Sequence, residues 1–144
     1  MSFYKHSARK RFGQHWLVDE SVLDKIIDAA DLEGKDRVLE VGPGLGSLTE
    51  RLINSEAKSV HAIEIDRDLI SVLKKRFKSK EKFSLQEGDF LSVPLEFPDE
   101  IYANKVVANI PYNITGPLLE KLLGGLGEPL QNTYERIVLL LQKE

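Results

Sequence analysis

Two short motifs contain the side chains that could do chemistry in this chain. The first is LEVGPGLG, from Leu39 to Gly46, which is typical of a buried strand entering a glycine turn where backbone amides approach a nucleotide-like cofactor. The second is NIPY, from Asn109 to Tyr112, which sets a carboxamide, a rigid proline and an aromatic ring at the end of another apolar run. In this order, with acidic residues between them, the two motifs favour methylation of an exocyclic amino nitrogen on a flat base.

NIPY is the predicted catalytic motif. The N6 nitrogen of adenine is a poor nucleophile because its lone pair is delocalised into the ring. If Asn109 Oδ1 and the Ile110 carbonyl accept the two N6 hydrogens, electron density returns to the nitrogen and no ionised general base is needed. Pro111 fixes φ, and in-line alignment would contribute much of the rate. Tyr112 can stack on a base turned out of its helix, a contact worth about 1–3 kcal/mol. As an isolated tetrapeptide, NIPY is also consistent with a strand end and a proline turn that buries Tyr112 in the core.

The glycine turn is the predicted cofactor site, with Gly42 and Gly44 as contacts. Its spacing is GxGxG after an acid, Glu40, and it differs from the GxGxxG spacing of dinucleotide binders. S-adenosylmethionine has no pyrophosphate, so this spacing favours S-adenosylmethionine over NAD. Ligands of doubly wound sheets bind beyond the carboxyl ends of the strands, which is where we expect these glycines to lie.

Two acids that follow later strands complete the predicted cofactor site. Glu64, 22 positions after Gly42, is the expected acceptor for both ribose hydroxyls, through charge-assisted bonds worth about 1.5–3 kcal/mol each. Asp66 competes for this role, but its position fits the N-cap of the next helix better. Asp89 is expected to accept from the adenine amino group, and the alternative is a turn-forming aspartate beside Gly88.

Apolar periodicity predicts the elements that would position these residues. Helices are expected at 21–32, 47–55, 66–78 and 116–123, and strands at 37–41, 58–65, 83–86, 105–108 and 135–142, with a loop at 88–104. Strands alternating with helices imply a largely parallel sheet covered on both faces, an α/β, Rossmann-like fold. Ile137 to Leu141 is apolar enough for a central strand, so residues 1–144 are expected to be the N-terminal portion of a longer protein.

Composition limits the remaining possibilities. The chain has 144 residues, enough for one domain, with no cysteine and a net charge of −3, so disulfides and thiolate metal sites are excluded. We find neither a secretory signal nor the roughly 20 apolar residues of a membrane helix, and we expect a soluble, cytoplasmic protein. Two basic clusters, in the first eleven residues and between Lys74 and Lys82, could steer a phosphate backbone. The alternatives are a disordered arm and a solvated helix end.

These motifs, together with KRFGQHWL from Lys10 to Leu17, resemble the rRNA adenine N6-methyltransferase family, most closely its KsgA-type small-subunit rRNA dimethyladenosine transferases. The resemblance extends over essentially the whole chain. It implies an S-adenosylmethionine-dependent enzyme that dimethylates N6 of two adjacent adenosines near the 3′ end of small-subunit (16S) rRNA, on the immature small ribosomal subunit, during ribosome assembly. We expect a monomer that uses no metal.

The resemblance also implies roles for individual residues. By the family pattern, the segment from Gln14 to Leu17 closes over the methionine end of the cofactor, with His15 and Leu17 in contact, and many relatives have asparagine in place of His15. The positions that match the family's cofactor contacts are Gly42, Glu64, Asp89 and Asn109, and those that match its base-handling positions are Asn109 and Tyr112. Family members continue through further strands and a helical rRNA-binding domain, so residues 1–144 would be an incomplete S-adenosylmethionine-binding catalytic domain.

Other functions stay open from the sequence. They are a large-subunit rRNA methylase conferring antibiotic resistance, a DNA adenine methylase, an NAD-dependent dehydrogenase, and a non-catalytic RNA-binding relative. The QHWL motif argues against the DNA enzyme, and NIPY without GxGxxG argues against the dehydrogenase. The intact Asn109 and Tyr112 argue against a non-catalytic relative.

Overall fold

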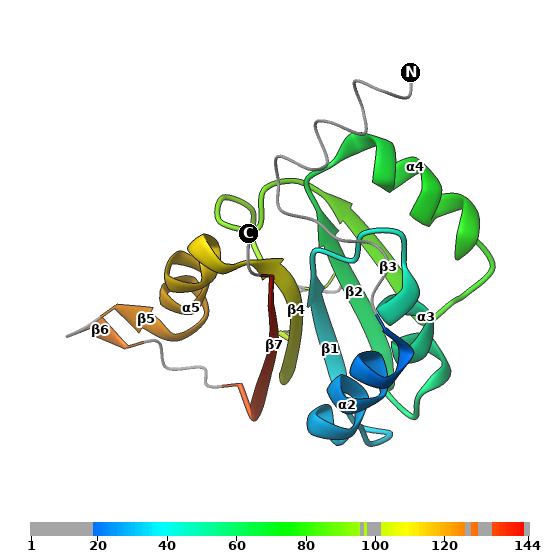
Figure 1. The fold of residues 1–144 in the computed structure, drawn as a ribbon, viewed down its shortest axis with the longest axis horizontal. Coiled ribbons are helices and arrows are strands. Elements are labelled where there is room, and N and C mark those ends of the chain that lie inside the picture. Colours follow the sequence, from blue (N-terminus) through cyan, green and yellow to red (C-terminus); the bar gives the residue numbers. More distant parts are fainter. Residues whose placement is uncertain (1–18, 96, 98–101, 126–127, 130–133, 143–144) are drawn as a thin grey trace.

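The computed structural model describes residues 19–95, 97, 102–125, 128–129 and 134–142. Five parallel strands form one twisted sheet in the order β3-β2-β1-β4-β7 (Figure 1). The strands are β1 (Arg37–Val41), β2 (Ser59–Glu64), β3 (Phe83–Glu87), β4 (Lys105–Pro111) and β7 (Arg136–Gln142). The predicted α/β fold with a parallel sheet is therefore confirmed.

Helices cover both faces of this sheet. The helices are α2 (Glu20–Ala30), α3 (Ser47–Asn54), α4 (Arg67–Arg76) and α5 (Thr115–Leu123). The first three pack on one face, where Leu23, Leu52 and Leu73 join Val38 and Val60 in a buried cluster. On the other face, α5 packs with the segment around Leu95 and Phe97 in a second cluster. Because neighbouring strand residues point to opposite faces, a strand covered on both sides is mostly apolar.

The helix starts follow local capping chemistry. The Asp66 side chain accepts a hydrogen bond from the Asp68 amide at 2.8 Å, which makes Asp66 the N-cap of α4, as predicted. Asp19 caps α2 in the same way, through the amide and hydroxyl of Ser21. Both caps can be recognised from sequence because donor and acceptor lie two residues apart.

The largest departures from the predicted elements follow residue 108. β4 continues through Asn109 and Ile110 to Pro111, because β7 pairs with it along that whole length, up to Gln142. The chain then enters a 3₁₀ turn, η1 (Tyr112–Ile114), before α5. A two-stranded pair, β5 (Gly124–Gly125) and β6 (Glu128–Pro129), was not predicted, since two-residue strands carry no periodicity.

A buried polar network fixes β4 beside β1. Lys105 Nζ lies 2.8 Å from Asp36 Oδ2, and both side chains are almost fully buried. Lys105 Nζ also donates to the carbonyl of Asp31. Asn104 donates to Asp36 Oδ1 at 2.8 Å and accepts from the Arg37 amide at 2.7 Å. Register is thus held at the amino ends of the two strands whose carboxyl ends carry the predicted motifs.

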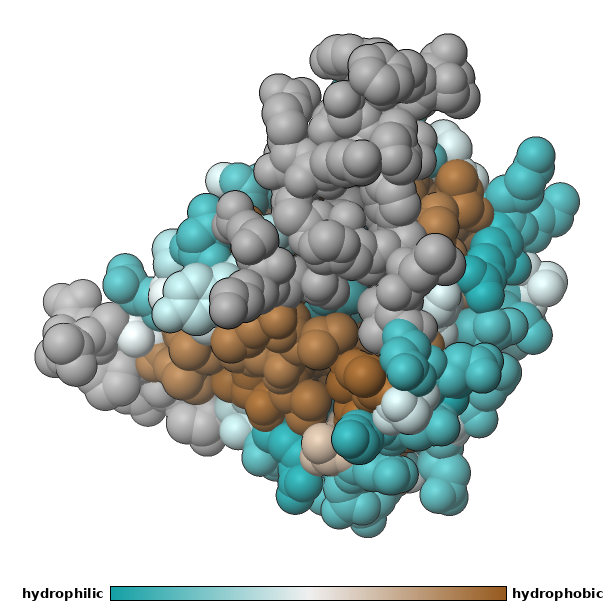
Figure 2. Space-filling view, in the orientation of Figure 1, coloured by the Kyte–Doolittle hydropathy of each residue, from teal (hydrophilic) through white to brown (hydrophobic). Residues whose placement is uncertain are grey.

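β7 is an edge strand of the described sheet. Among the described strands it pairs with β4 alone, so the central position expected for it is not seen there. Its residue Leu141 is 43% exposed, and Leu123 of α5 is also exposed. Figure 2 shows an apolar area in the region that β7 and α5 occupy in Figure 1.

Candidate active site

The described residues of the predicted site lie at or just beyond the carboxyl ends of four adjacent strands. In the parallel register, Val41 of β1 lies opposite Ile63 of β2 and opposite Ala108 of β4. The Gly42 amide continues this pairing by donating to the Ile63 carbonyl at 3.1 Å, and the Gly88 amide donates to the Glu64 carbonyl at 2.9 Å. One edge of the sheet therefore carries the glycine turn, both acids and NIPY, as the topology rule for doubly wound sheets predicts.

Gly42 brings the two motifs into backbone contact. Its φ is +75°, and a Cβ added to it would lie 2.7 Å from the main-chain oxygen of Asn109. Any side chain here would push β4 away from the turn that follows β1. The glycine is therefore required by the close approach of the two chain segments, as well as by its left-handed conformation.

Gly46 is required for a different reason. Its φ is +97°, and an added Cβ would lie 2.8 Å from the Phe77 ring and 3.1 Å from Leu73. The start of α3 thus packs directly on the end of α4. This glycine supports the turn through packing and needs no ligand to explain it.

Glu64 closes the glycine turn against β2. The side chain is only 1% exposed. Its Oε1 accepts from the Gly44 amide at 3.2 Å, and its Oε2 accepts from the Asp66 amide at 2.9 Å. A carboxylate has about four lone-pair sites, so a buried carboxylate can accept from several donors at once.

Glu40 is a functional candidate to which the sequence prediction assigned no role. It is 1% exposed, and its Oε1 accepts from Thr49 Oγ1 at 2.6 Å, whereas Oε2 has no hydrogen-bond partner among the described residues. Burial raises the pKa of Glu40 to about 8; the Thr49 hydrogen bond opposes this rise and the nearby Glu64 charge adds to it. The acid immediately before GxGxG was the available signal. A buried carboxyl with one oxygen unpaired among the described residues therefore lies directly under the turn.

Asp89 forms the turn that was considered as the alternative to a cofactor role. Its Oδ1 accepts from the Leu91 amide at 2.9 Å, and its carbonyl accepts from the amides of Ser92 and Val93. Lys121 of α5 donates to the Val93 carbonyl beside it. Burial lowers the pKa of Lys121, and the Asp89 charge partly opposes that shift. The predicted contact of Asp89 with adenine stays a prediction.

The four NIPY residues lie in contrasting environments. Asn109 and Pro111 are half-buried and Ile110 is buried in the second core cluster. Tyr112 is 67% exposed, so the alternative that placed its ring in the core is wrong. Pro111 has φ −61° and ψ 145° and directs the chain from β4 into η1. The motif therefore combines a rigid, anchored backbone with an accessible aromatic ring.

Three further predictions concern residues near the N-terminus, metal binding and membrane helices. His15, Leu17 and the first basic cluster lie outside the described residues. Within the described residues, no group of three or more histidine, aspartate or glutamate side chains could hold a metal ion. No helix in the described ranges is long and apolar enough to span a bilayer.

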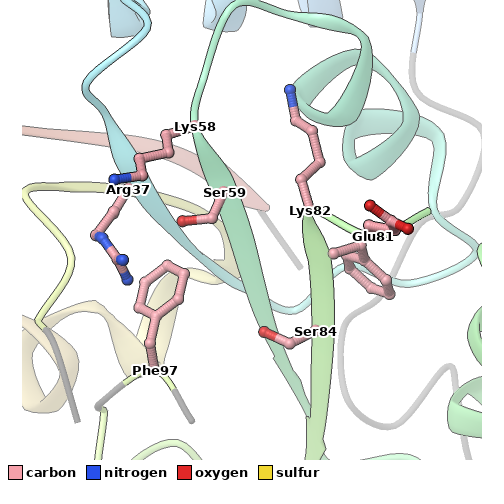
Figure 3. Close-up of a pocket in the computed structure, with 8 residues that line it drawn as sticks. Arg37, Lys58, Ser59, Glu81, Lys82, Ser84 and Phe97 are labelled. Atoms are coloured by element: carbon pink, nitrogen blue, oxygen red, sulfur yellow. The ribbon is translucent and has the colours of Figure 1, made fainter. Parts of the chain in front are cut away.

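A cavity of about 320 Å³ lies at the opposite, amino-terminal edge of the sheet (Figure 3). Arg37, Ser59 and Phe83, the first residues of β1, β2 and β3, line it together with Lys58 and Phe97. Since the strand lengths separate it from the glycine turn, this cavity is distinct from the predicted cofactor site.

The fold defines the class of protein. A five-stranded parallel sheet of this order, with the glycine turn after β1 and an acid after β2, is the fold of S-adenosylmethionine-dependent methyltransferases. An RNA methyltransferase from Salinibacter ruber in complex with S-adenosyl-L-homocysteine shares it with a TM-score of 0.60, over 73% of this chain and 69% of that one. At 22% identity, that likeness concerns the fold alone.

The chain belongs to the ribosomal RNA adenine dimethylase family, whose model matches residues 5–144. It is 65% identical over its whole length to the ribosomal RNA small subunit methyltransferase A of Prochlorococcus marinus (strain MIT 9303), and it covers 51% of that protein. A dimethyladenosine transferase from Plasmodium falciparum is similar in structure, with a TM-score of 0.73 and 36% identity over 88% of this chain and 43% of that one. The chain thus spans about half the length of the curated relatives that it matches.

The residues present fit the family's cofactor. Gly42 and Gly44 keep the turn free of side chains, and Glu64 is a buried acceptor held at the same edge. A second carboxyl, Glu40, is buried under the turn, and its Oε2 has no hydrogen-bond partner among the described residues. A cationic, hydroxyl-bearing ligand matches this acceptor-rich edge.

Proposed function

We propose that the full-length protein transfers methyl groups from S-adenosylmethionine to N6 of two adjacent adenosines in the 3′-terminal hairpin of small-subunit rRNA, during ribosome assembly. The observation that carries this proposal is the backbone contact between Gly42 and Asn109. This contact supports a methyl donor at the glycine turn that lies close enough to an acceptor base at NIPY for direct methyl transfer. The naming of the 65% identical relative supports the small subunit as substrate.

Bound S-adenosylmethionine would supply an electrophilic methyl group on its sulfonium. The main chain at Gly42 and Gly44 would contact the cofactor. Glu64 would accept hydrogen bonds from its ribose hydroxyls, and Asp89 would accept from its adenine amino group. His15 and Leu17 would close over its methionine end.

Asn109 and Ile110 would activate the target amine by accepting its two hydrogens, which directs the lone pair toward the donor. Pro111 limits the backbone freedom of these acceptors. Tyr112, exposed beside them, would stack on the adenine after the base leaves its helix. Alignment and hydrogen bonding would therefore replace deprotonation of the amine before attack.

In this proposal a monomeric enzyme binds the immature small ribosomal subunit in the cytoplasm. Residues 1–144 would be an incomplete S-adenosylmethionine-binding catalytic domain. The remaining length of the relatives would contain further strands and a helical rRNA-binding domain.

The test measures transfer of labelled methyl groups by the full-length protein to unmethylated small subunits, with large subunits in parallel. We expect labelled dimethyladenosine in small-subunit rRNA, abolished by Asn109→Ala and retained in Asn54→Ala, a change at an exposed asparagine at the end of α3. Label in large-subunit rRNA alone would contradict the proposed substrate. No transfer to either subunit would contradict the enzyme assignment.

A further inference from the structure

Positive charge is concentrated where α4 ends and β3 begins. Between Lys74 and Lys82 there are six lysine and arginine side chains and one glutamate, in a chain whose net charge is −3. Figure 2 shows a hydrophilic surface on the side where α4 lies in Figure 1. The cluster therefore requires an explanation of its own.

Two of the six cations have structural roles. Arg76 donates to the Leu45 carbonyl at 2.7 Å and to Glu50 Oε1 at 2.8 Å, and its guanidinium lies 5.2 Å from the centre of the Phe77 ring. Lys82 donates to the Ser55 carbonyl at 3.0 Å. These bonds tie α4 and β3 to the neighbouring α3 region.

The other four cations have no such role. Lys74, Lys75, Lys78 and Lys80 are all exposed, and their side chains have no hydrogen-bond or ion-pair partner in the described part of the chain. We call these four residues the lysine surface. Lys74 and Lys75 complement the dipole at the end of α4, but that effect decays within the last turn and does not explain Lys78 and Lys80, which follow the helix. Four neighbouring like charges repel one another unless an external anion lies between them.

The lysine surface and NIPY lie against different parts of the glycine turn. The end of α4 packs on the last residues of the turn, because Arg76 donates to the Leu45 carbonyl at 2.7 Å and a Cβ at Gly46 would lie 2.8 Å from the Phe77 ring. NIPY instead contacts the first glycine of the turn, through the main-chain oxygen of Asn109 beside Gly42. At the amino edge, positive charge continues with Lys58 at the cavity of Figure 3, where the buried Ser59 Oγ has no hydrogen-bond partner among the described residues. Glu81 is the acid of this cavity lining.

We propose that the lysine surface binds the phosphate backbone of small-subunit rRNA at a distance from the target adenosines. Flexible, exposed ammonium groups at and after the end of α4 suit a chain of phosphates, because each lysine can neutralise one phosphate without a fixed geometry. The surface would anchor the substrate and contribute to its affinity, leaving base selection to the NIPY end. This inference rests on the proposed function for the identity of the RNA.

The test compares two variants of the full-length protein that lose the same charge. Lys78→Gln with Lys80→Gln removes half of the lysine surface. Lys25→Gln with Lys35→Gln removes two exposed lysines from α2 and from the segment before β1. Binding to unmethylated small subunits is measured between about 50 and 200 mM salt, with S-adenosylhomocysteine binding as a check on folding.

We expect the first variant to bind small subunits roughly tenfold more weakly at low salt, with the slope of log affinity against log salt reduced by about two. Cofactor binding and the maximal methylation rate should stay at wild-type values, and the control should change less than twofold. Unchanged affinity in the first variant, or an equal loss in the control, would overturn the inference. A wild type that methylates large subunits alone, with the same loss of affinity for them in the first variant, would contradict the proposed substrate and support the lysine surface.

Discussion

A Cβ at Gly42 would lie 2.7 Å from the main-chain oxygen of Asn109, so the glycine turn and the NIPY motif are in direct backbone contact although 67 positions separate the two residues in sequence. The contact exists because β1 and β4 are neighbours in register, with Val41 opposite Ala108. A donor and an acceptor held by these two segments cannot drift apart without disrupting the sheet.

The Gly42–Asn109 contact predicts that Gly42→Ala separates the two motifs. The φ of +75° and the clash should together cost about 1–3 kcal/mol of folding free energy, and we expect at least a tenfold loss of S-adenosylhomocysteine affinity by calorimetry. The control is Gly116→Ala in α5, where an added Cβ meets nothing within 4 Å. That change should leave S-adenosylhomocysteine affinity close to the wild-type value. Wild-type cofactor affinity in Gly42→Ala would contradict the structural role assigned to the contact.

The exposure of Tyr112 predicts a separation between stability and activity. Tyr112→Ala should leave the melting temperature almost unchanged, because the side chain is 67% exposed. It should lower kcat/KM for small subunits by about 5- to 150-fold, which corresponds to the loss of about 1–3 kcal/mol of stacking. Tyr112→Phe keeps the ring and should retain most of the activity. If the Phe variant is as impaired as the Ala variant, stacking is not the role of this ring.

The raised pKa of Glu40 predicts a pH dependence of stability. The pKa is about 8 in the folded protein and 4.5 as the reference. Between these values the unfolded chain releases the proton and the folded protein retains it. The free energy of unfolding should therefore fall as pH rises through this range.

Glu40→Gln removes the titrating group and keeps its shape. We expect this variant to flatten the pH dependence and to raise the melting temperature at pH 8 by more than about 3 °C. Glu50→Gln, at an exposed glutamate paired with Arg76, serves as the control and should not flatten the curve. Thermal scans from pH 5 to 8 measure both, and identical slopes in wild type and Glu40→Gln would contradict the assignment.

The buried pair of Lys105 and Asp36 predicts a large cost for removing one partner. Lys105→Met leaves the Asp36 charge buried, and we expect a loss of about 3–5 kcal/mol in denaturant unfolding. Adding Asp36→Asn to this variant should recover part of the loss, since the stranded charge is removed. An equal or larger loss in the double variant would contradict the pair as the cause.

Asp36 also predicts sensitivity to acid. Burial raises its pKa, but the bonds from Lys105, Asn104 and the Glu33 amide more than offset this, so the pKa falls below 3.8. A lowered pKa contributes stability above the unfolded value, and this contribution is lost as pH falls through the folded pKa. Wild type should therefore lose stability below about pH 4 more steeply than the double variant, as measured by urea titrations from pH 5 to 2.

Much of this structure could be predicted because its signals are local. The Asp66 cap, the glycine turn and the alternation of strands and helices depend on residues within a few positions of one another. The turn formed by Asp89 is also local, and it was considered beside the cofactor role. Contacts such as Glu40 with Thr49 and Lys105 with Asp36 were missed, because partners on different elements leave no periodic trace.

By itself, the sequence determined the family, the order of the elements and the motifs proposed to act in catalysis, since these features depend on residue types and short spacings. Only the tertiary structure decided that Asn109 lies against Gly42, that Glu40 is buried with an open oxygen, and that Tyr112 is exposed. It also decided which lysines after α4 have structural partners and which do not. The physical reason is that strand order and register, which bring distant residues together at one sheet edge, arise from packing of the whole domain.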